Sequence, residues 1–478
     1  MEIANECRLN VKGSALDIVL THGYFLQEDE AEKRIMKPYP TLGILYISAY
    51  LKSKGFHVEV FDSTFQSKKA FTRYLADTRP SIVGIYVNLM TKLNALWMIR
   101  ECKAHGCTVI VGGPEIPYYG EDFLKHGADV GVIGEGELTL QELIPHLQKS
   151  GASGMQHVSG IVYRENDGTI IRTPERQLIA DLDQLPDPDR GAIDLARYIQ
   201  TWKTHHGKGS VSLICARGCP FTCTWCSRSV FGDTHRRRSP QRVVDEIEFL
   251  LATYHPDMLW FADDVFTINH RWFYQFHDEM KRRNIRIPFE CISRADRLNE
   301  DILQKMAELG SFRIWYGSES GSQKILDAMQ RRVKVEQIQT ITRLAQKYGI
   351  EAGLFVMLGY PGEEIEDIDA TIEHLKATKP DTYLTTVAYP IKGTTMYNEV
   401  RDRLLVNDDW ASSTDRSIDF RGRHSSRFYY FATRHMVNEV LFFRLRSNGH
   451  RPFGPRLTSF AKSKLARIGM HLTERTRT

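Results

Sequence analysis

The chain has 478 residues, of which 42% are hydrophobic and 26% charged, and its formal net charge is +4. No stretch reaches the roughly 18 uninterrupted apolar residues of a membrane-spanning helix. The opening residues, MEIANECRLN, also lack the basic and apolar regions of a secretory signal. We therefore expect a cytoplasmic protein of two or three domains whose cysteines are reduced.

The first 150 residues alternate between short β-rich apolar runs and longer segments with helical periodicity. Helix-like segments include 41–55 and 138–150. The strand-like runs cover residues 15–20, 57–62, 81–87, 107–113 and 129–134. Such alternation predicts an α/β domain over 1–150 with a doubly wound, Rossmann-like parallel sheet.

Polar residues and glycines follow these strands, at the edge where parallel sheets bind ligands. No GxGxxG follows the first strand, so a dinucleotide is not expected. Plain turn chemistry is the alternative to ligand binding. The candidate residues are Asp62, Asn88, Met90, Thr91, Gly112, Gly113, Pro114, Glu115, Gly134, Glu135 and Gly136.

Residues 151–200 interrupt the alternation. The stretch 159–172 predicts a hairpin around Asn-Asp-Gly. The stretch 181–190, rich in Pro and Asp, predicts an extended linker.

Strand–helix alternation resumes over 201–400. Strands are expected near 211–216, 258–263, 287–292, 312–317, 352–358 and 381–389. Helices are expected over 239–253, 269–283, 299–309, 321–329, 335–348 and 363–377. Six consecutive βα units predict a partial (β/α)6 barrel of the TIM type, with its chemistry on the loops after the strands.

Three of the eight cysteines, Cys219, Cys223 and Cys226, lie within RGCPFTCTWCSRS, after the first of these strands. Three thiolates can hold three irons of a cubane cluster and leave the fourth iron open, whereas conventional clusters use four cysteines. The alternative is a structural zinc ion in a non-enzymatic scaffold, completed by Cys215 or His235. The remaining cysteines are expected to be buried.

The CxxxCxxC spacing, with Trp225 just before the last cysteine, resembles the signature of the radical S-adenosylmethionine (SAM) superfamily. The resemblance implies a 4Fe-4S cluster on the three cysteines, with SAM chelated at the open iron and cleaved to a 5′-deoxyadenosyl radical. It also implies SAM contacts from Trp225 and from residues at later strand ends. These are Asp263, Asp264, Arg294, Glu319 and Gly359.

Each of these residues has a structural alternative. Asp263 or Asp264 could cap the following helix. Arg294 could instead bridge Asp296 or Asp301. Glu363, beside the Gly359 segment, could be an ordinary acid in the first turn of a helix.

The first half is similar to the cobalamin-binding domain often joined to this barrel, through the segments 39–62, 111–115 and 131–143. This similarity implies cobalamin as a cofactor, contacted by the strand-end residues given above. The chain departs from other cobalamin proteins because it lacks the cobalt-ligating DxHxxG motif; His22-Gly23 is the nearest approach to it.

Together the resemblances imply a cobalamin-dependent radical SAM enzyme that methylates an unactivated carbon of a small molecule. The alternative is oxidative cyclisation or rearrangement of a tetrapyrrole-like or lipid substrate with the same cofactors. Either reaction implies an electron donor such as flavodoxin or ferredoxin.

The last segment, 401–478, is expected to be a mainly helical extension, with 16 Lys and Arg against seven Asp and Glu. The aromatic stretch 427–444 is expected to cover the open side of the barrel and to shape the substrate pocket.

Leu457, Phe460, Leu465 and Ile468 have helical spacing within a basic stretch. This predicts peripheral contact with an anionic membrane, a helix packed on the barrel with a solvated basic face, or a frayed end. Nucleic acid is not an expected partner, because the basic residues are not interleaved with stacking aromatics.

Overall fold

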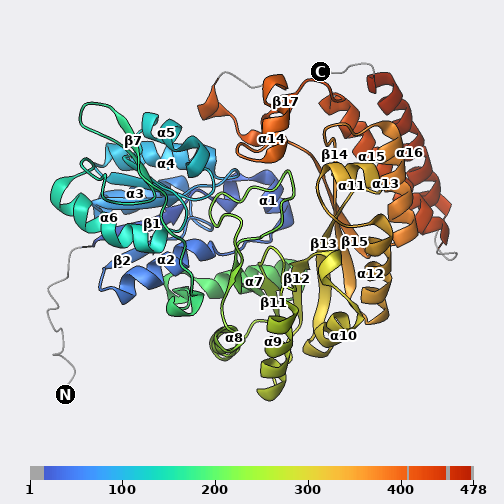
Figure 1. Cartoon of the computed structure of the whole chain (residues 1–478), viewed down its shortest axis with the longest axis horizontal. Coiled ribbons are helices and arrows are strands. Elements are labelled where there is room, and N and C mark those ends of the chain that lie inside the picture. Colours follow the sequence, from blue (N-terminus) through green and yellow to red (C-terminus); the bar gives the residue numbers. More distant parts are fainter. Residues whose placement is uncertain (1–15, 406–408, 448–452, 475–478) are drawn as a thin grey trace, which may run out of the picture.

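The computed structural model describes residues 16–405, 409–447 and 453–474. Figure 1 shows two halves side by side, each built around a sheet. The N-terminal half is blue to cyan, and the other half runs from green to red. No helix in the described ranges has the length and apolarity to cross a bilayer.

The first half is a seven-stranded sheet in the order β2-β1-β3-β4-β5-β6-β7. The first five strands in this order are parallel, and β6 and β7 add an antiparallel hairpin beside β5. Its elements are β1 (Ile18–His22), α1 (Glu30–Ile35), α2 (Leu42–Ser53), β2 (Val58–Phe61), α3 (Lys68–Thr78), β3 (Ile82–Tyr86), α4 (Lys92–Ala104), β4 (Thr108–Gly112), α5 (Ile116–Lys125), β5 (Val130–Val132), α6 (Gly136–Ser150), β6 (Ile161–Arg164) and β7 (Ile170–Arg172). The predicted hairpin at 159–172 is confirmed, and its strands extend the first sheet.

The strand order of the first sheet creates a natural binding crevice. The chain goes from β1 to β2 on one side and then returns to β3 on the other side of β1. The helices that leave β1 and β3 therefore diverge, and ligands bind in open α/β sheets at such a switch point. Apolar side chains such as Val19 and Val83 are fully buried, as expected for strands covered on both faces.

The second half is a six-stranded parallel sheet in the order β15-β14-β13-β12-β11-β8. Its elements are α7 (Leu195–His206), β8 (Ser210–Leu213), β9 (Ala216–Arg217), β10 (Arg236–Arg237), α8 (Pro240–Tyr254), β11 (Met258–Phe261), α9 (His270–Arg282), β12 (Phe289–Ser293), α10 (Glu300–Leu309), β13 (Ser311–Glu319), α11 (Gln323–Ala328), α12 (Val335–Lys347), β14 (Glu351–Leu358), α13 (Ile365–Thr378) and β15 (Thr382–Val387). All six predicted strands and all six predicted helices of this half are present. The molecule is therefore a mixed α/β protein with two large sheets, one wholly and one mostly parallel.

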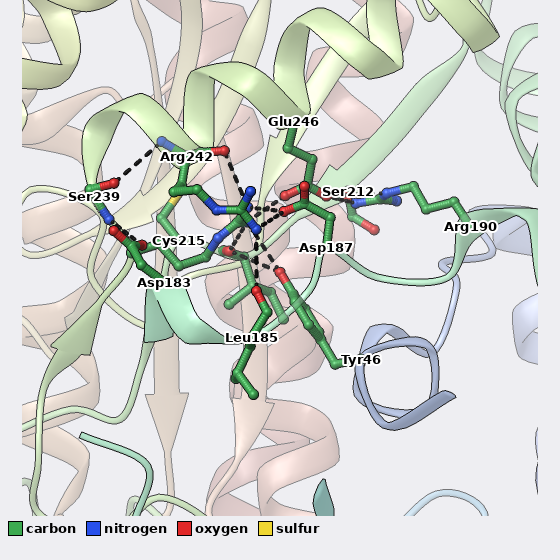
Figure 2. A network of polar contacts seen from close by, with 12 residues as sticks. Tyr46, Asp183, Leu185, Asp187, Arg190, Ser212, Cys215, Ser239, Arg242 and Glu246 are labelled. Carbon is green, nitrogen blue, oxygen red and sulfur yellow. Dashed lines mark hydrogen bonds and ion pairs between the residues drawn. The ribbon is translucent and has the colours of Figure 1, made fainter. Parts of the chain in front are cut away.

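A buried ionic network fastens the linker before β8 to the second half (Figure 2). Arg190 donates to Glu246 of α8 at 2.6 Å and to the carbonyl of Ser212 at 2.8 Å. Arg238 pairs with the other carboxylate oxygen of Glu246 and with Asp187. Burial alone would raise the pKa of Glu246, but the two guanidinium groups outweigh burial and hold that pKa below its usual value.

The segment after β15 returns to the first half and then leaves it again. Its elements are α14 (Thr395–Val400), β16 (Leu404–Leu405), β17 (Asp419–Phe420), α15 (Ser426–Ser447) and α16 (Phe453–Glu474). The buried Lys92 of α4 donates to the carbonyls of Trp410 and Ser413, at 2.7 and 2.8 Å. Asp415 accepts a 2.6 Å hydrogen bond from Tyr119 of α5. These contacts attach residues 410–415 to the first domain.

The aromatic stretch 427–444 forms most of α15, which packs its Phe428, Tyr429 and Met436 into the core of the second half. Arg444 at its end lies over Tyr383 of the edge strand β15. No residue of this stretch is among the residues that line the two cavities described next. A role in shaping a substrate pocket is therefore not supported by its position.

Candidate functional site

A cavity of about 480 Å³ lies at the carboxyl ends of the first sheet and extends to the second sheet. Side chains such as Leu20, Ile44 and Leu140 give it apolar walls on the side of the first half. Trp260 and Ala262, at the end of β11, contribute from the second half. We call this space the apolar cavity; it lies at the β1/β3 switch point.

Glycines shape the edge of the apolar cavity. Gly113 has a φ of +120°, and a Cβ atom there would lie 2.3 Å from the carbonyl oxygen of Val87. Only glycine can adopt this turn after β4 without displacing the neighbouring backbone. The turn brings the main chain of Gly112–Pro114 to the cavity surface, where a large flat ligand could lie against it.

Seven of the eleven residues predicted to bind cobalamin line the apolar cavity. They are Asn88, Gly112, Gly113, Pro114, Gly134, Glu135 and Gly136. The other four, Asp62, Met90, Thr91 and Glu115, are not among the lining residues.

Each of those four residues has another contact. Asp62 accepts hydrogen bonds from Tyr198 and Thr64. The hydroxyl of Thr91 accepts from the backbone of Asn88, and the sulfur of Met90, a side chain that is 53% exposed, lies 2.9 Å from Nη1 of Arg416. Glu115 is buried near Lys92 and Asp415; burial and the charge of Asp415 raise its pKa to about 7. These four residues therefore serve the local structure of the loops in this conformation.

Glu135 lines the apolar cavity but is held in an ion-pair network. It pairs with Arg217 at 2.7 Å and with Arg236 at 2.8 Å, and only 4% of its side chain is exposed. Its neighbour Glu137 pairs with the second nitrogen of Arg217 at 2.6 Å. Arg217 and Arg236 lie on β9 and β10, so this network ties the first sheet to the base of the cysteine loop.

His22, the nearest approach to a cobalt-ligating motif, is turned away from the apolar cavity. Its Nε2 contacts Asp62 at 3.0 Å, and its Nδ1 contacts the Ser63 hydroxyl at 3.1 Å. The side chain is buried and does not line the cavity. Both ring nitrogens are thus occupied by structural contacts.

The cysteine loop is a long turn closed at its base by the antiparallel pair β9 and β10. Gly218 has a φ of +88°, and a Cβ atom there would lie 2.3 Å from the carbonyl oxygen of Thr234. The middle of the loop is anchored by Thr224, whose hydroxyl lies 2.6 Å from that of Tyr360. These contacts fix the loop that carries the three thiols.

Cys219, Cys223 and Cys226 all line a second cavity, of about 440 Å³, which we call the cysteine cavity. All seven described cysteines are free thiols. Trp225, Asp264, Arg294 and Glu319 also line this cavity. The structure therefore gathers the three predicted cluster ligands and four of the predicted SAM contacts around one space.

Two arginines converge on the thiol of Cys223. Arg294 and Arg331 each place a guanidinium nitrogen 3.5 Å from its sulfur. The Arg294 guanidinium stacks over Phe221 at 3.8 Å. A hydrogen bond from Cys226, together with the two positive charges, lowers the pKa of the Cys223 thiol. This environment favours the thiolate at Cys223, whereas burial raises the pKa of the Cys219 thiol, and the hydrogen bond to Cys223 together with burial raises that of Cys226.

Arg294 also makes the bridge to Asp296 that the sequence offered as an alternative to ligand binding. Its Nε donates to Asp296 at 2.8 Å, and its Nη2 donates to the carbonyl of Arg331 at 2.6 Å. The bridge to Asp296 orients the guanidinium toward the cysteine cavity, so this contact is compatible with the predicted role in ligand binding.

Glu319 is buried at the end of β13 with a φ of +53°, where the register with β14 shifts. A left-handed conformation is costly for a glutamate and is a feature of functional sites. Burial raises the pKa of Glu319 to about 7, although Arg331 lies 3.9 Å away. The side chain can therefore act as donor or acceptor near neutral pH.

Asp263 and Gly359 are not among the residues lining the cysteine cavity. Asp263 is buried, accepts the Cys215 amide at 3.1 Å and lies 3.7 Å from Arg237. The amide of Gly359 donates to the buried Glu363 at 2.5 Å. In this conformation both residues support the loops rather than the cavity surface.

The two cavities share a wall. Pro114 from the first half and Val230 and Phe231 from the cysteine loop line both. Ligands in the two spaces would be neighbours separated by these side chains.

The zinc alternative finds little support in this geometry. Cys215 is fully buried, and neither it nor His235 lines the cysteine cavity. Within the described ranges, no three His, Cys, Asp or Glu side chains are grouped closely enough for one metal ion. Thiols that each bind a different iron of a cubane do not need such a grouping.

Comparisons with known proteins identify two domains in this chain. Residues 213–375 match the radical SAM superfamily, and residues 34–144 match the B12 binding domain. The chain therefore carries a B12 binding domain ahead of a radical SAM domain. These domains imply the three cofactors expected from the sequence: a 4Fe-4S cluster, SAM and cobalamin.

Its relatives are enzymes. An uncharacterized methyltransferase of Pyrococcus horikoshii is 28% identical over 78% of this chain and 82% of its own length. The anaerobic magnesium-protoporphyrin IX monomethyl ester cyclase of Rubrivivax gelatinosus is 26% identical over 77% of this chain and 68% of its own length. The chain therefore belongs among enzymes.

Two solved structures share the fold. The radical SAM methyltransferase TsrM of Kitasatospora setae superposes with a TM-score of 0.69 at 18% identity, over 82% of this chain and 78% of TsrM. The cobalamin-dependent SAM radical enzyme OxsB superposes with a TM-score of 0.73 at 17% identity, over 95% of this chain and 72% of OxsB.

Sequence reasoning missed Arg331, Phe221 and the pairs Glu135–Arg217 and Glu135–Arg236. Arg331 follows α11 between Gln330 and Arg332, both of which have positive φ. No motif in the sequence marks it. An arginine in a tight turn after a short helix was the only available signal.

Proposed function

We propose that the protein is a cobalamin-dependent radical SAM enzyme that methylates an unactivated carbon of a small-molecule substrate. The supporting observation is the shared wall of Pro114, Val230 and Phe231 between the apolar and cysteine cavities. A methyl donor in one cavity and a hydrogen-abstracting radical in the other must reach the same carbon, so their sites must adjoin. The six-stranded sheet would then be the partial barrel predicted from the sequence.

The residues of the cysteine cavity fit an iron–sulfur cluster and SAM. Cys219, Cys223 and Cys226 would hold the cluster and leave one iron for SAM. Arg294 would meet a carboxylate through Nη1, because its Nε and Nη2 are bonded to Asp296 and Arg331, and Glu319 would accept from ribose hydroxyls. When bound, these cofactors supply a carbon-centred radical, and cobalamin supplies the methyl group.

The protein's own groups would position the ligands and exclude water. Arg294 and Arg331 stabilise negative charge on Cys223 and close the cavity behind it. Trp225 lies beneath Arg331, with 5.7 Å between the guanidinium carbon and the ring centre. The glycines at 112, 113, 134 and 136 would let a corrin ring approach the main chain. An electron donor such as flavodoxin or ferredoxin would bind elsewhere on the surface.

The decisive experiment replaces one cluster cysteine. After anaerobic reconstitution, the wild-type chain should hold about four irons and form 5′-deoxyadenosine from SAM. Cys223→Ala should lose the cluster and this product. Cys291→Ala is the matched control, because Cys291 is buried in β12 and lines neither cavity. Product formation by Cys223→Ala at the wild-type rate would contradict the assignment.

Cyclisation is the second candidate, favoured by the 26% identity to the cyclase of Rubrivivax gelatinosus. SAM with a deuterated methyl group separates the two reactions once substrate is known. Methyl transfer carries the label into the product, whereas cyclisation leaves the product unlabelled.

A further inference from the structure

Helix α16 exposes its large apolar side chains to solvent. Leu457, Leu465, Ile468 and Leu472 are 55%, 67%, 54% and 77% exposed. Their spacing of three, four and eight residues places them on one face of the helix, together with the exposed Ala461. We call these five residues the apolar stripe. Figure 1 shows α16 at the outer edge of the second half, away from the first half.

The opposite face of α16 packs with Met470, which is fully buried in the core of the second half, and with small residues. Ser463 is fully buried, and its hydroxyl contacts His435 of α15 at 3.0 Å and donates to Glu439 at 2.6 Å. A Cβ atom at Gly469 would lie 2.5 Å from the ring of Phe431. Small residues let the two helices approach closely. The leucines are therefore not needed to hold α16 on the protein, and their exposure calls for another explanation.

The charge around the apolar stripe is positive. Lys462 and Lys464 are exposed and flank the stripe on opposite sides of the helix. Glu474, the last residue of α16, is the only acidic residue in this helix. Arg467 is already paired with Asp369 at 2.6 Å.

We infer that α16 docks on an anionic lipid surface through the apolar stripe, with Lys462 and Lys464 contacting the headgroups. A helix with apolar residues on one face and lysines at its borders lies in the interface of such a bilayer. Each nearby lysine adds attraction to negatively charged lipid. A second copy of the chain fits less well, because two such stripes would bring four lysines together. This inference is independent of the cofactor chemistry proposed above.

The test is flotation of the full-length protein with vesicles of phosphatidylcholine alone or mixed with phosphatidylglycerol. We expect binding to the mixed vesicles, weak binding to phosphatidylcholine, and release by high salt. Leu465→Gln/Leu472→Gln should lower the partition coefficient more than tenfold. Lys462→Glu/Lys464→Glu should lower it by at least about fivefold per lysine.

Matched controls keep the test specific. Phe249→Gln removes a side chain on α8 that is 50% exposed, and Lys69→Glu/Lys149→Glu makes the same charge change on α3 and α6; both should bind like the wild type. Equal binding to both vesicle types would overturn the inference. Unchanged vesicle binding by the leucine variant would also overturn it. A wild-type protein that binds no vesicles but forms a dimer, which the leucine variant dissociates, would overturn it as well. Circular dichroism and the melting temperature show that each variant is folded.

Discussion

The apolar cavity and the cysteine cavity meet at Pro114, Val230 and Phe231, yet they are built in different ways. The apolar cavity is bounded mainly by main chain and by aliphatic and aromatic side chains, with the paired Glu135 among its lining residues. The cysteine cavity is bounded by thiols and charged side chains that hold one another in place, such as Arg331 beside Cys223 and Glu319. The first fits a ligand held by shape, and the second fits a ligand held by charge and covalent bonds.

The two cavities should therefore differ in how much a single substitution near each one destabilises the fold. Removing one aliphatic side chain from the apolar cavity enlarges it but leaves no charge unpaired. Removing one carboxylate from the paired network at the base of the cysteine loop leaves a buried guanidinium without compensation, which costs more than the loss of an exposed pair would. Charge substitutions should therefore produce the larger effects on stability.

The largest effect is expected from Glu135→Gln, at the network between the cavities. Glu135 neutralises Arg236 and shares Arg217 with Glu137. The variant leaves a buried guanidinium without its carboxylate, so the free energy of unfolding should fall by about 3–5 kcal/mol. Urea unfolding measures this change.

Glu142→Gln is the control for that experiment. Glu142 also pairs with an arginine, Arg176, but its side chain is 49% exposed. Its loss should cost at most about 1 kcal/mol. Equal losses of unfolding free energy in the two variants would show that the network between the cavities stabilises the fold no more than an exposed ion pair does.

A smaller, pH-dependent effect is expected from Glu319→Gln. The folded-state pKa of Glu319 is raised from 4.5 to about 7, so the folded protein binds this proton more tightly than the unfolded chain does. Stability from this group is present below pH 4.5 and is lost as the pH rises through 7. The loss approaches about 3 kcal/mol, at about 1.4 kcal/mol per unit of pKa.

Glutamine imitates the protonated acid and does not titrate. The variant should therefore match the wild type near pH 4.5 and exceed it in stability at pH 8, in the absence of cofactors. Denaturant unfolding of both proteins from pH 4.5 to 8 measures the difference. A difference that stays constant across this range would contradict the raised pKa.

Much of the architecture could be predicted from local patterns. The strands and helices of the second half follow from hydrophobic periodicity, and the three cysteines are visible because their spacing is contiguous. The charged partners could not be predicted in the same way. Arg217 and Arg236 lie some 80 to 100 residues from Glu135, so only folding reveals that this glutamate is paired.

The orientation of α16 could not be predicted from the sequence either. The spacing of Leu457, Leu465 and Ile468 predicts a helix, and burial of these three side chains would be the ordinary expectation. The structure instead buries Ser463 and Gly469 against α15. Periodicity identifies the faces of a helix but does not decide which face packs when one carries small residues and the other large ones.

The smallest expected effect concerns the apolar cavity, where shape rather than charge should control binding. Gly43 is the second residue of α2 and lines this cavity, and a Cβ atom there would meet no atom within 4 Å. Gly43→Phe would therefore be tolerated by the helix while its ring occupies ligand space. We expect corrinoid affinity to fall at least tenfold, about 1.4 kcal/mol, with iron content unchanged. Gly191→Phe is the control, since a Cβ at Gly191 also meets no atom within 4 Å, but this residue lines neither cavity. Equilibrium dialysis with hydroxocobalamin measures both affinities. Equal affinities for Gly43→Phe and the wild type would mean that the corrinoid does not occupy the apolar cavity.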